Sequence, residues 1–128
     1  MASQNAALYA DFFKALDRFN DHQTPSRGFE PDIIYSFIHS GLLLASSHEP
    51  KAQQANVLLC ELTLRRVYFT LIEAIEDPTR SMIFRRVCLD SLHSPLIQLK
   101  RFYEQFDGGR QRYSLLQQRL QRLQAPLD

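Results

Sequence analysis

The side chains best suited to acid–base, nucleophilic or metal chemistry are few and scattered along this chain. They are His22, His39, His48, His93, Cys60 and Cys88. Neither cysteine has a second cysteine or a histidine at metal-ligand spacing, and both lie in apolar stretches typical of buried, reduced thiols. Common catalytic motifs are also missing, including the glycine-rich phosphate loop, His-Glu-x-x-His and Gly-x-Ser-x-Gly. We therefore expect no metal site, no cofactor and no enzymatic activity.

One pair of residues has a spacing that could serve RNA cleavage. Arg86 and His93 are separated by six residues near the end of a predicted helix. This spacing resembles the ribonuclease signature of HEPN domains, which are also small and helical. The resemblance implies that the pair would position and polarise an RNA phosphate and 2′-hydroxyl, although Val87 stands where that family usually has a polar residue. The alternative is structural, with Arg86 paired to Asp90 and His93 capping a helix end.

Basic doublets form a second group of candidate residues. They are Arg65-Arg66, Arg85-Arg86 and Lys100-Arg101, each inside a predicted helix. Helices packed side by side could join them into one basic patch for phosphate or for an acidic protein. The alternative is local pairing of the arginines with Glu61, Asp90 or Glu104.

Composition and charge exclude several function classes. The chain has 128 residues, of which 45% are hydrophobic and 23% charged, and its net charge is +1. This length suits a single domain over 1–128 with its own core. A net charge so near zero gives no general attraction to nucleic acid or to a membrane surface. Arginine outnumbers lysine twelve to three, which favours bidentate and interface contacts.

Two further features concern location. The first five residues lack the basic and apolar segments of a signal peptide. The longest apolar stretch, 33–45, is too short to span a bilayer. We therefore expect a cytoplasmic protein without a membrane partner.

Apolar residues recur at helical spacing along most of the chain, and turn-forming residues separate the segments. The expected helices cover about residues 3–20, 31–46, 51–76, 80–92, 95–106 and 110–124, with a loop over about 21–30. No run alternates in the manner of a strand. The predicted fold is an all-α bundle of five or six helices, largely antiparallel, around the long central helix 51–76.

The central helix carries two adjacent apolar stripes. The first stripe comprises Val57, Cys60, Leu64, Val67, Leu71 and Ile75, and the second comprises Leu58, Leu62, Phe69 and Ile72. Together they are wider than one partner helix would cover. Nearly complete burial is therefore expected for Leu64, Val67, Phe69 and Leu71, and Glu61 should pair with Arg65 one turn along.

The C-terminal helix carries a short seam of the coiled-coil type, formed by Tyr113, Leu116, Leu120 and Leu123 at spacings of three, four and three. No acidic residue lies between Asp107 and Asp128. Two interpretations stay open: a final bundle helix that docks on its own core, or a dimerisation or partner helix. In the second, the binding residues are Tyr113, Leu116, Arg119, Leu120, Arg122 and Leu123.

The leading functional hypothesis is a non-enzymatic protein–protein interaction module, such as an adaptor, an assembly or secretion chaperone, or a regulator. Its partner is another protein, and a homodimer that includes the C-terminal helix is expected. The alternative is a nucleic-acid-binding regulator that uses the arginine-rich C-terminal portion, although no helix-turn-helix signature supports it. The remote alternative is a HEPN-like ribonuclease.

Overall fold

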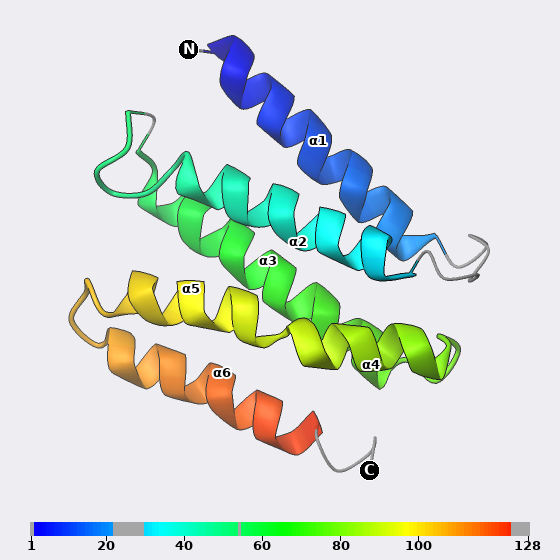
Figure 1. Cartoon of the computed structure of the whole chain (residues 1–128). Helices are drawn as coiled ribbons and strands as arrows, with labels where there is room; N and C mark the ends of the chain where they lie inside the picture. Colours follow the sequence, from blue (N-terminus) through cyan, green and yellow to red (C-terminus); the bar gives the residue numbers. More distant parts are fainter. Residues whose placement is uncertain (1, 22–29, 54, 124–128) are drawn as a thin grey trace.

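The computed structural model describes residues 2–21, 30–53 and 55–123, and these form a bundle of six helices (Figure 1). The helices are α1 (Ala2–Asn20), α2 (Glu30–Ser46), α3 (Val57–Glu76), α4 (Met82–Ser91), α5 (His93–Tyr103) and α6 (Gly109–Leu123). Over the described ranges no strand occurs, so the predicted all-α bundle is confirmed. The loop predicted at 21–30 lies mainly outside the described residues.

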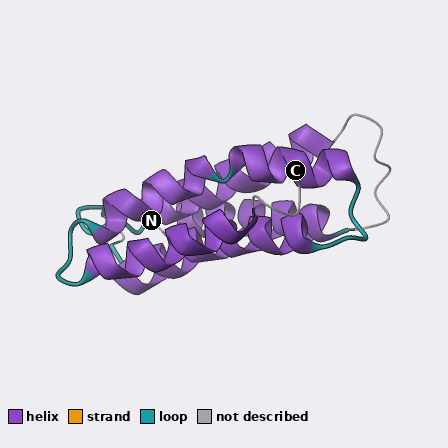
Figure 2. Cartoon of the chain, turned by 90° about the horizontal axis from the view of Figure 1, so that it is seen from below, coloured by secondary structure: helices purple, strands orange, loops and turns teal. Residues whose placement is uncertain are grey.

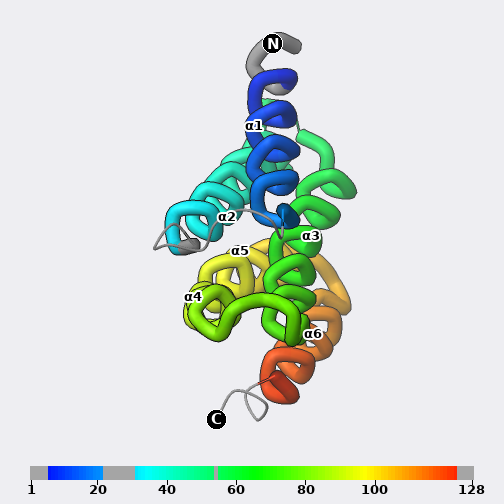
Figure 3. The backbone as a smooth tube through the Cα atoms, turned by 90° about the vertical axis from the view of Figure 1, so that its right-hand side faces the viewer, coloured from blue at the N-terminus to red at the C-terminus, as the bar shows by residue number. Residues whose placement is uncertain are grey.

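Helix α3 is the central element, as predicted, because α2, α4, α5 and α6 all pack against it. Helices α4 and α5 lie end to end and run antiparallel to α3, while α1 and α6 lie at opposite edges of the bundle (Figures 1 and 3). The helices share one long direction, which is clearest from below (Figure 2). No helix in the described part of the chain is long and apolar enough to cross a membrane.

The prediction for the start of the central helix was wrong, since α3 begins at Val57 rather than near residue 51. Asn56 is the N-cap, and its side-chain oxygen accepts a hydrogen bond from the amide of Leu59 at 3.2 Å. The Asn56 amide in turn donates to the carbonyl of His48 at 3.0 Å. The first amides of a helix have no carbonyl partner within the helix, and the Asn56 side chain supplies an acceptor for one of them. The helix therefore starts more favourably after Asn56 than after the residues before it.

Capping also explains where the shorter helix α4 begins. Ser81 caps α4 by accepting from the amide of Phe84 at 3.0 Å. Thr79, two residues earlier, is also a good capping residue, but its hydroxyl donates to the Asp77 carboxylate at 2.7 Å instead. Helix α5 ends at Tyr103 rather than near residue 106, and Gly108 adopts a positive φ of 76° in the turn to α6, a conformation that glycine adopts without strain.

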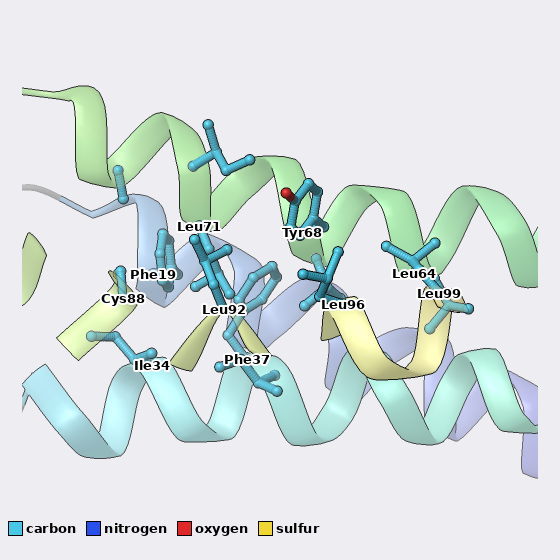
Figure 4. Packing of buried hydrophobic residues seen from close by; sticks show 14 of the residues in the cluster. Phe19, Ile34, Phe37, Leu64, Tyr68, Leu71, Cys88, Leu92, Leu96 and Leu99 are labelled. Carbon is cyan, nitrogen blue, oxygen red and sulfur yellow. The ribbon is translucent and has the colours of Figure 1, made fainter. Parts of the chain in front are cut away.

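The buried core draws residues from all six helices, and Figure 4 shows Leu71, Leu92 and Phe37 close together within it, whereas Leu99 lies beside Leu64 farther along the bundle. Close approach of α2 to α3 depends on Gly41, because a Cβ atom there would collide with the side chain of Val67. These contacts exclude water from one whole side of α3.

Burial along α3 confirms part of the core prediction and corrects the rest. Leu64, Val67 and Leu71 are buried as expected. Phe69 is only half-buried, because it lies at the edge of the interface with α6 rather than inside it. In the second stripe, Leu58 and Leu62 are 62% and 52% exposed, so the N-terminal half of this stripe has no covering helix in the described chain.

Three apolar residues on the shorter helices are exposed. They are Met82 and Ile83 in the first turn of α4, and Ile97 on α5. Each lies on the outer side of a helix whose opposite side packs against the core, and no described helix covers it.

Candidate functional site

The pair that resembles a ribonuclease signature takes part in a local helix-end contact. Arg86 Nε lies 3.6 Å from the Asp90 carboxylate, and His93 Nδ1 lies 2.9 Å from the Asp90 carbonyl oxygen. Both side chains are exposed, and Asp90 engages each of them. This geometry is the structural alternative predicted for the pair.

The six residues of the predicted basic patch are spread along the bundle. Arg85 donates from Nε to the carbonyl of Ile75 at 2.7 Å, which ties the start of α4 to the end of α3. Lys100 and Arg101 are exposed in the last turn of α5. About 21 Å separates Arg86 from Lys100, because they are fourteen residues apart on two helices that lie end to end.

The first doublet has a different environment. Arg66 is exposed, whereas Arg65 is half-buried at the boundary between α3, α5 and α6. Arg65 Nη1 donates to the hydroxyl of Tyr103 at 3.3 Å, and its guanidinium lies 5.2 Å from the centre of the Phe69 ring. The ion pair predicted between Glu61 and Arg65 is absent from the described residues, because Tyr103 and Arg112 take up Glu61 instead.

The seam of the C-terminal helix packs on its own chain. Leu116 and Leu123 are buried, and Tyr113 and Leu120 pack partly against the same core. The hydroxyl of Tyr68 donates to the Leu116 carbonyl at 2.5 Å, which fixes α6 against α3. The seam therefore packs as expected of a final bundle helix that docks on its own core. Of the other predicted binding residues, Arg119 pairs with Glu76 on α3, and Arg122 is exposed to solvent.

A groove of about 430 Å³ runs between α3 and α6. Its lining residues are Glu61, Arg65, Phe69, Arg112, Leu115, Leu116 and Arg119. The wall formed by α6 consists of Arg112, Leu115 and Arg119, which share one helical face because they are three and four residues apart. The Leu115 side chain is 65% exposed. The α3 wall continues along the second stripe, because Leu58 and Leu62 lie on the same helical face as Arg65 and Phe69.

A partly buried polar network anchors one end of this groove. The Tyr103 hydroxyl donates to Glu61 Oε2 at 2.6 Å, and Arg112 Nη1 reaches the same oxygen at 3.4 Å. Burial raises the pKa of the Tyr103 phenol, and its hydrogen bond to Glu61 raises it further. Tyr103 therefore stays a proton donor at neutral pH and holds Glu61 in place between α3, α5 and α6.

The charge of the groove is predominantly positive. Three arginines line it against the single carboxylate of Glu61, and Glu76 lies beside Arg119 at 2.7 Å. The pair of Arg112 with Glu61 leaves the arginine side chain 66% exposed. Exposed ion pairs of this kind contribute at most about 1 kcal/mol each to stability. The arginines can therefore readily exchange their glutamate partners for another carboxylate.

A second cavity, of about 530 Å³, lies between the α2–α3 connection and α5 and includes Cys60 in its lining. Burial raises the pKa of the Cys60 thiol to about 11, with further contributions from Glu49 and Glu61. Cys88 is still more deeply buried, and its pKa rises to about 12. Both thiols are therefore protonated and poor nucleophiles at neutral pH. Within the described residues no group of three His, Cys, Asp or Glu side chains could hold a metal ion.

The sequence prediction missed Arg112 and Leu115. A detectable signal existed, because Arg112, Leu115, Arg119 and Arg122 repeat the spacing of the apolar seam one residue earlier. That row contains only one apolar residue, so a search for hydrophobic periodicity passes over it. The chain was also compared with models of protein families, with curated proteins and with solved structures, and none of these matches it.

Proposed function

We propose that this protein is a non-enzymatic protein-binding module that holds its partner at the groove between α3 and α6. The observation that supports this most directly is the uncovered second stripe, because Leu58, Leu62 and Leu115 are all more than half exposed beside a ready-made groove. Single exposed apolar residues are common on protein surfaces. A row that borders a groove between two helices is typical of a docking site.

The chemistry of the groove fits binding better than catalysis. Its polar atoms are arginine guanidinium groups and one carboxylate, and Tyr103 and Arg112 already hold that carboxylate. The groove presents no nucleophile beside a base, which covalent catalysis needs. An adaptor, a chaperone or a regulator would use such a surface in the same way.

Homodimer formation stays a prediction, and burial of the α6 seam changes where the contact would lie. A second copy could no longer use Leu116 and Leu123, because these side chains fill the core of their own chain. It would have to use apolar residues that are exposed, such as Ile83 on α4, Ile97 on α5 or Leu58 on α3. The mass of the purified protein by sedimentation equilibrium tests this prediction.

Photo-crosslinking tests the proposed function directly. A benzophenone amino acid replaces Leu62, on the exposed α3 stripe that continues from the groove, or Leu115, in the α6 wall of the groove, and the proteins are illuminated in an extract of the native cells. The matched control replaces Tyr35, an equally exposed aromatic residue on α2, which does not line the groove. We expect both groove positions to label the same protein and Tyr35 to label none. Equal labelling at all three positions, or none at the groove, would contradict the proposal.

A further inference from the structure

The charge and shape of the α3–α6 groove also indicate what kind of partner it binds. We propose that the partner is an acidic amphipathic helix, whose apolar face covers Leu58, Leu62 and Leu115 and whose carboxylates pair with Arg65, Arg112 and Arg119. This inference rests on the proposed function and specifies the chemistry of the bound segment.

The apolar part of the surface has the geometry of a helix-docking site. On α3, Leu58 and Leu62 stand one turn apart, and Phe69 continues the row into the groove. On α6, Leu115 stands opposite this row. Two helices that border a groove present ridges on both sides, and a third helix can place its apolar side chains between them.

The cationic part of the surface is incompletely neutralised. Arg65 interacts with a hydroxyl and an aromatic ring, and it forms no ion pair with any carboxylate of the described residues. Arg112 and Arg119 each pair with one partly exposed glutamate of α3. Helix α6 has four arginines and no acidic residue over its whole length. Carboxylates brought by a partner would therefore find bidentate donors on both walls.

Charge disfavours a second copy of this chain as the occupant of the groove. A symmetric pairing through the same surface would place the groove arginines of both chains in one interface, where only the α3 glutamates that they already pair with would offset them. A phosphate backbone would suit the arginines, but it would leave the leucines uncovered. An acidic amphipathic helix satisfies both parts of the surface at once.

Binding of designed peptides to the full-length protein tests this inference. The probe is a fluorescently labelled helical peptide of about five turns, with leucines along one face and glutamates beside them. In one matched peptide lysine replaces every glutamate, and in the other serine replaces every leucine. We expect the acidic peptide to bind at least about tenfold more tightly than either one in fluorescence anisotropy. Its affinity should fall as salt concentration rises.

Charge reversal on the protein sharpens the test. The Arg112→Glu/Arg119→Glu variant should lose at least about tenfold in affinity for the acidic peptide and gain affinity for the lysine peptide. The matched control, Arg101→Glu/Arg110→Glu, makes the same change in net charge on exposed arginines outside the groove. If the reversed variant does not fold by circular dichroism, Arg112→Gln/Arg119→Gln replaces it, with the expected loss of affinity for the acidic peptide alone.

Several outcomes would overturn the inference. These are no preference for the acidic peptide, equal losses in the groove and control variants, or equal competition by a short single-stranded RNA of mixed sequence. A wild-type dimer that Leu62→Glu/Leu115→Glu dissociates would identify a second copy as the occupant instead. If crosslinking at Leu62 and Leu115 still captures one protein in any of these cases, the proposed function stands and only the acidic-helix assignment fails.

Discussion

The two sides of helix α3 pack very differently. Toward α2 the helices approach so closely that Gly41 leaves no space for a methyl group against Val67. Aromatic rings fill the adjoining core, with Phe19 4.8 Å from Phe37 and 5.1 Å from Phe84 between ring centres. Toward α6 the apolar contact is confined to the seam of α6, and long polar side chains and the Tyr68 hydroxyl on the carbonyl of Leu116 add directional contacts.

This difference shows how a small bundle can combine a stable core with an adaptable surface. The side of α3 that faces α2 gains its stability from dry burial, which is proportional to apolar area removed from water. The side that faces α6 combines a shorter apolar seam with directional contacts, of which the exposed ion pairs contribute little. Helix α6 buries only Gly109, Leu116 and Leu123, so we expect it to exchange amide hydrogens faster than α2 or α3.

The largest expected effect is on the dry side. Leu71→Ala removes a side chain with no exposed surface and should lower the free energy of unfolding by about 2–5 kcal/mol. Leu115→Ala, in the groove, should change it by less than about 0.5 kcal/mol, because that side chain is already in water. Urea denaturation of the two variants measures both values. Similar losses at the two positions would abolish the distinction between the sides.

Alkaline pH should act on the buried groups of both sides. Burial raises the pKa of Tyr68 from 10.0 to about 12, and that of the Cys88 thiol from 9.0 to about 12. The unfolded chain releases these protons first, so stability is complete below pH 9 and is lost as pH rises from 9 to 12. In the Tyr68→Phe variant, the loss in free energy of unfolding by pH 12 should be smaller by about 1–3 kcal/mol.

Unfolding curves measured at intervals across this pH range, for the wild type and for Tyr68→Phe, provide the comparison. Tyr35→Phe is the matched control, because Tyr35 is exposed and the substitution removes the same hydroxyl group. An identical alkaline loss in the Tyr68→Phe and wild-type proteins would show that this phenol does not couple to folding.

Because α2 and α3 approach closely, replacing a glycine by alanine at their contact should lower stability, whereas this substitution in a helix usually raises it. Inside a helix, Gly→Ala ordinarily stabilises by about 1 kcal/mol. At Gly41 the added methyl group collides with Val67, so Gly41→Ala should instead destabilise by about 1–3 kcal/mol. The Val67→Ala background should reduce this penalty, and a double-mutant cycle by thermal unfolding measures the coupling. A stabilising Gly41→Ala would mean that the two helices pack less tightly.

The smallest effect is expected on the α6 side. The ion pair of Arg119 with Glu76 is about half exposed, and a double-mutant cycle of Arg119→Gln and Glu76→Gln should give a coupling of about 0–1 kcal/mol. High salt should reduce it further. A coupling above about 2 kcal/mol would show that charge, rather than the apolar seam, holds α6 in place.

Hydrophobic periodicity was sufficient to predict the helices and most of the core. The face of α3 that includes Leu64, Val67 and Leu71 is buried as its spacing indicated. Helix starts were less predictable, because Asn56 and Thr79 are both good capping residues and only neighbouring contacts decide which one caps a helix.

The candidate groove could be predicted only in part. Arg119 and the seam of α6 were recognisable from spacing, whereas Leu115 looked like an isolated apolar residue in a polar row. Its place beside Phe69 depends on how α6 lies against α3, and Tyr68 and Tyr103 fix that orientation through hydrogen bonds across the fold. Contacts between residues some forty or fifty positions apart leave no local pattern to detect.

The sequence by itself determined that the chain is helical, where the apolar stripes run and that the C-terminal helix is basic, because these depend on residue type and on the helical repeat. Tertiary structure decided which stripes are covered. The two stripes of α3 look equally apolar in sequence, yet the surrounding helices bury the first from Cys60 onward and leave Leu58 and Leu62 of the second in water. Burial is a property of the neighbours that pack on a residue, and only the folded bundle supplies those neighbours.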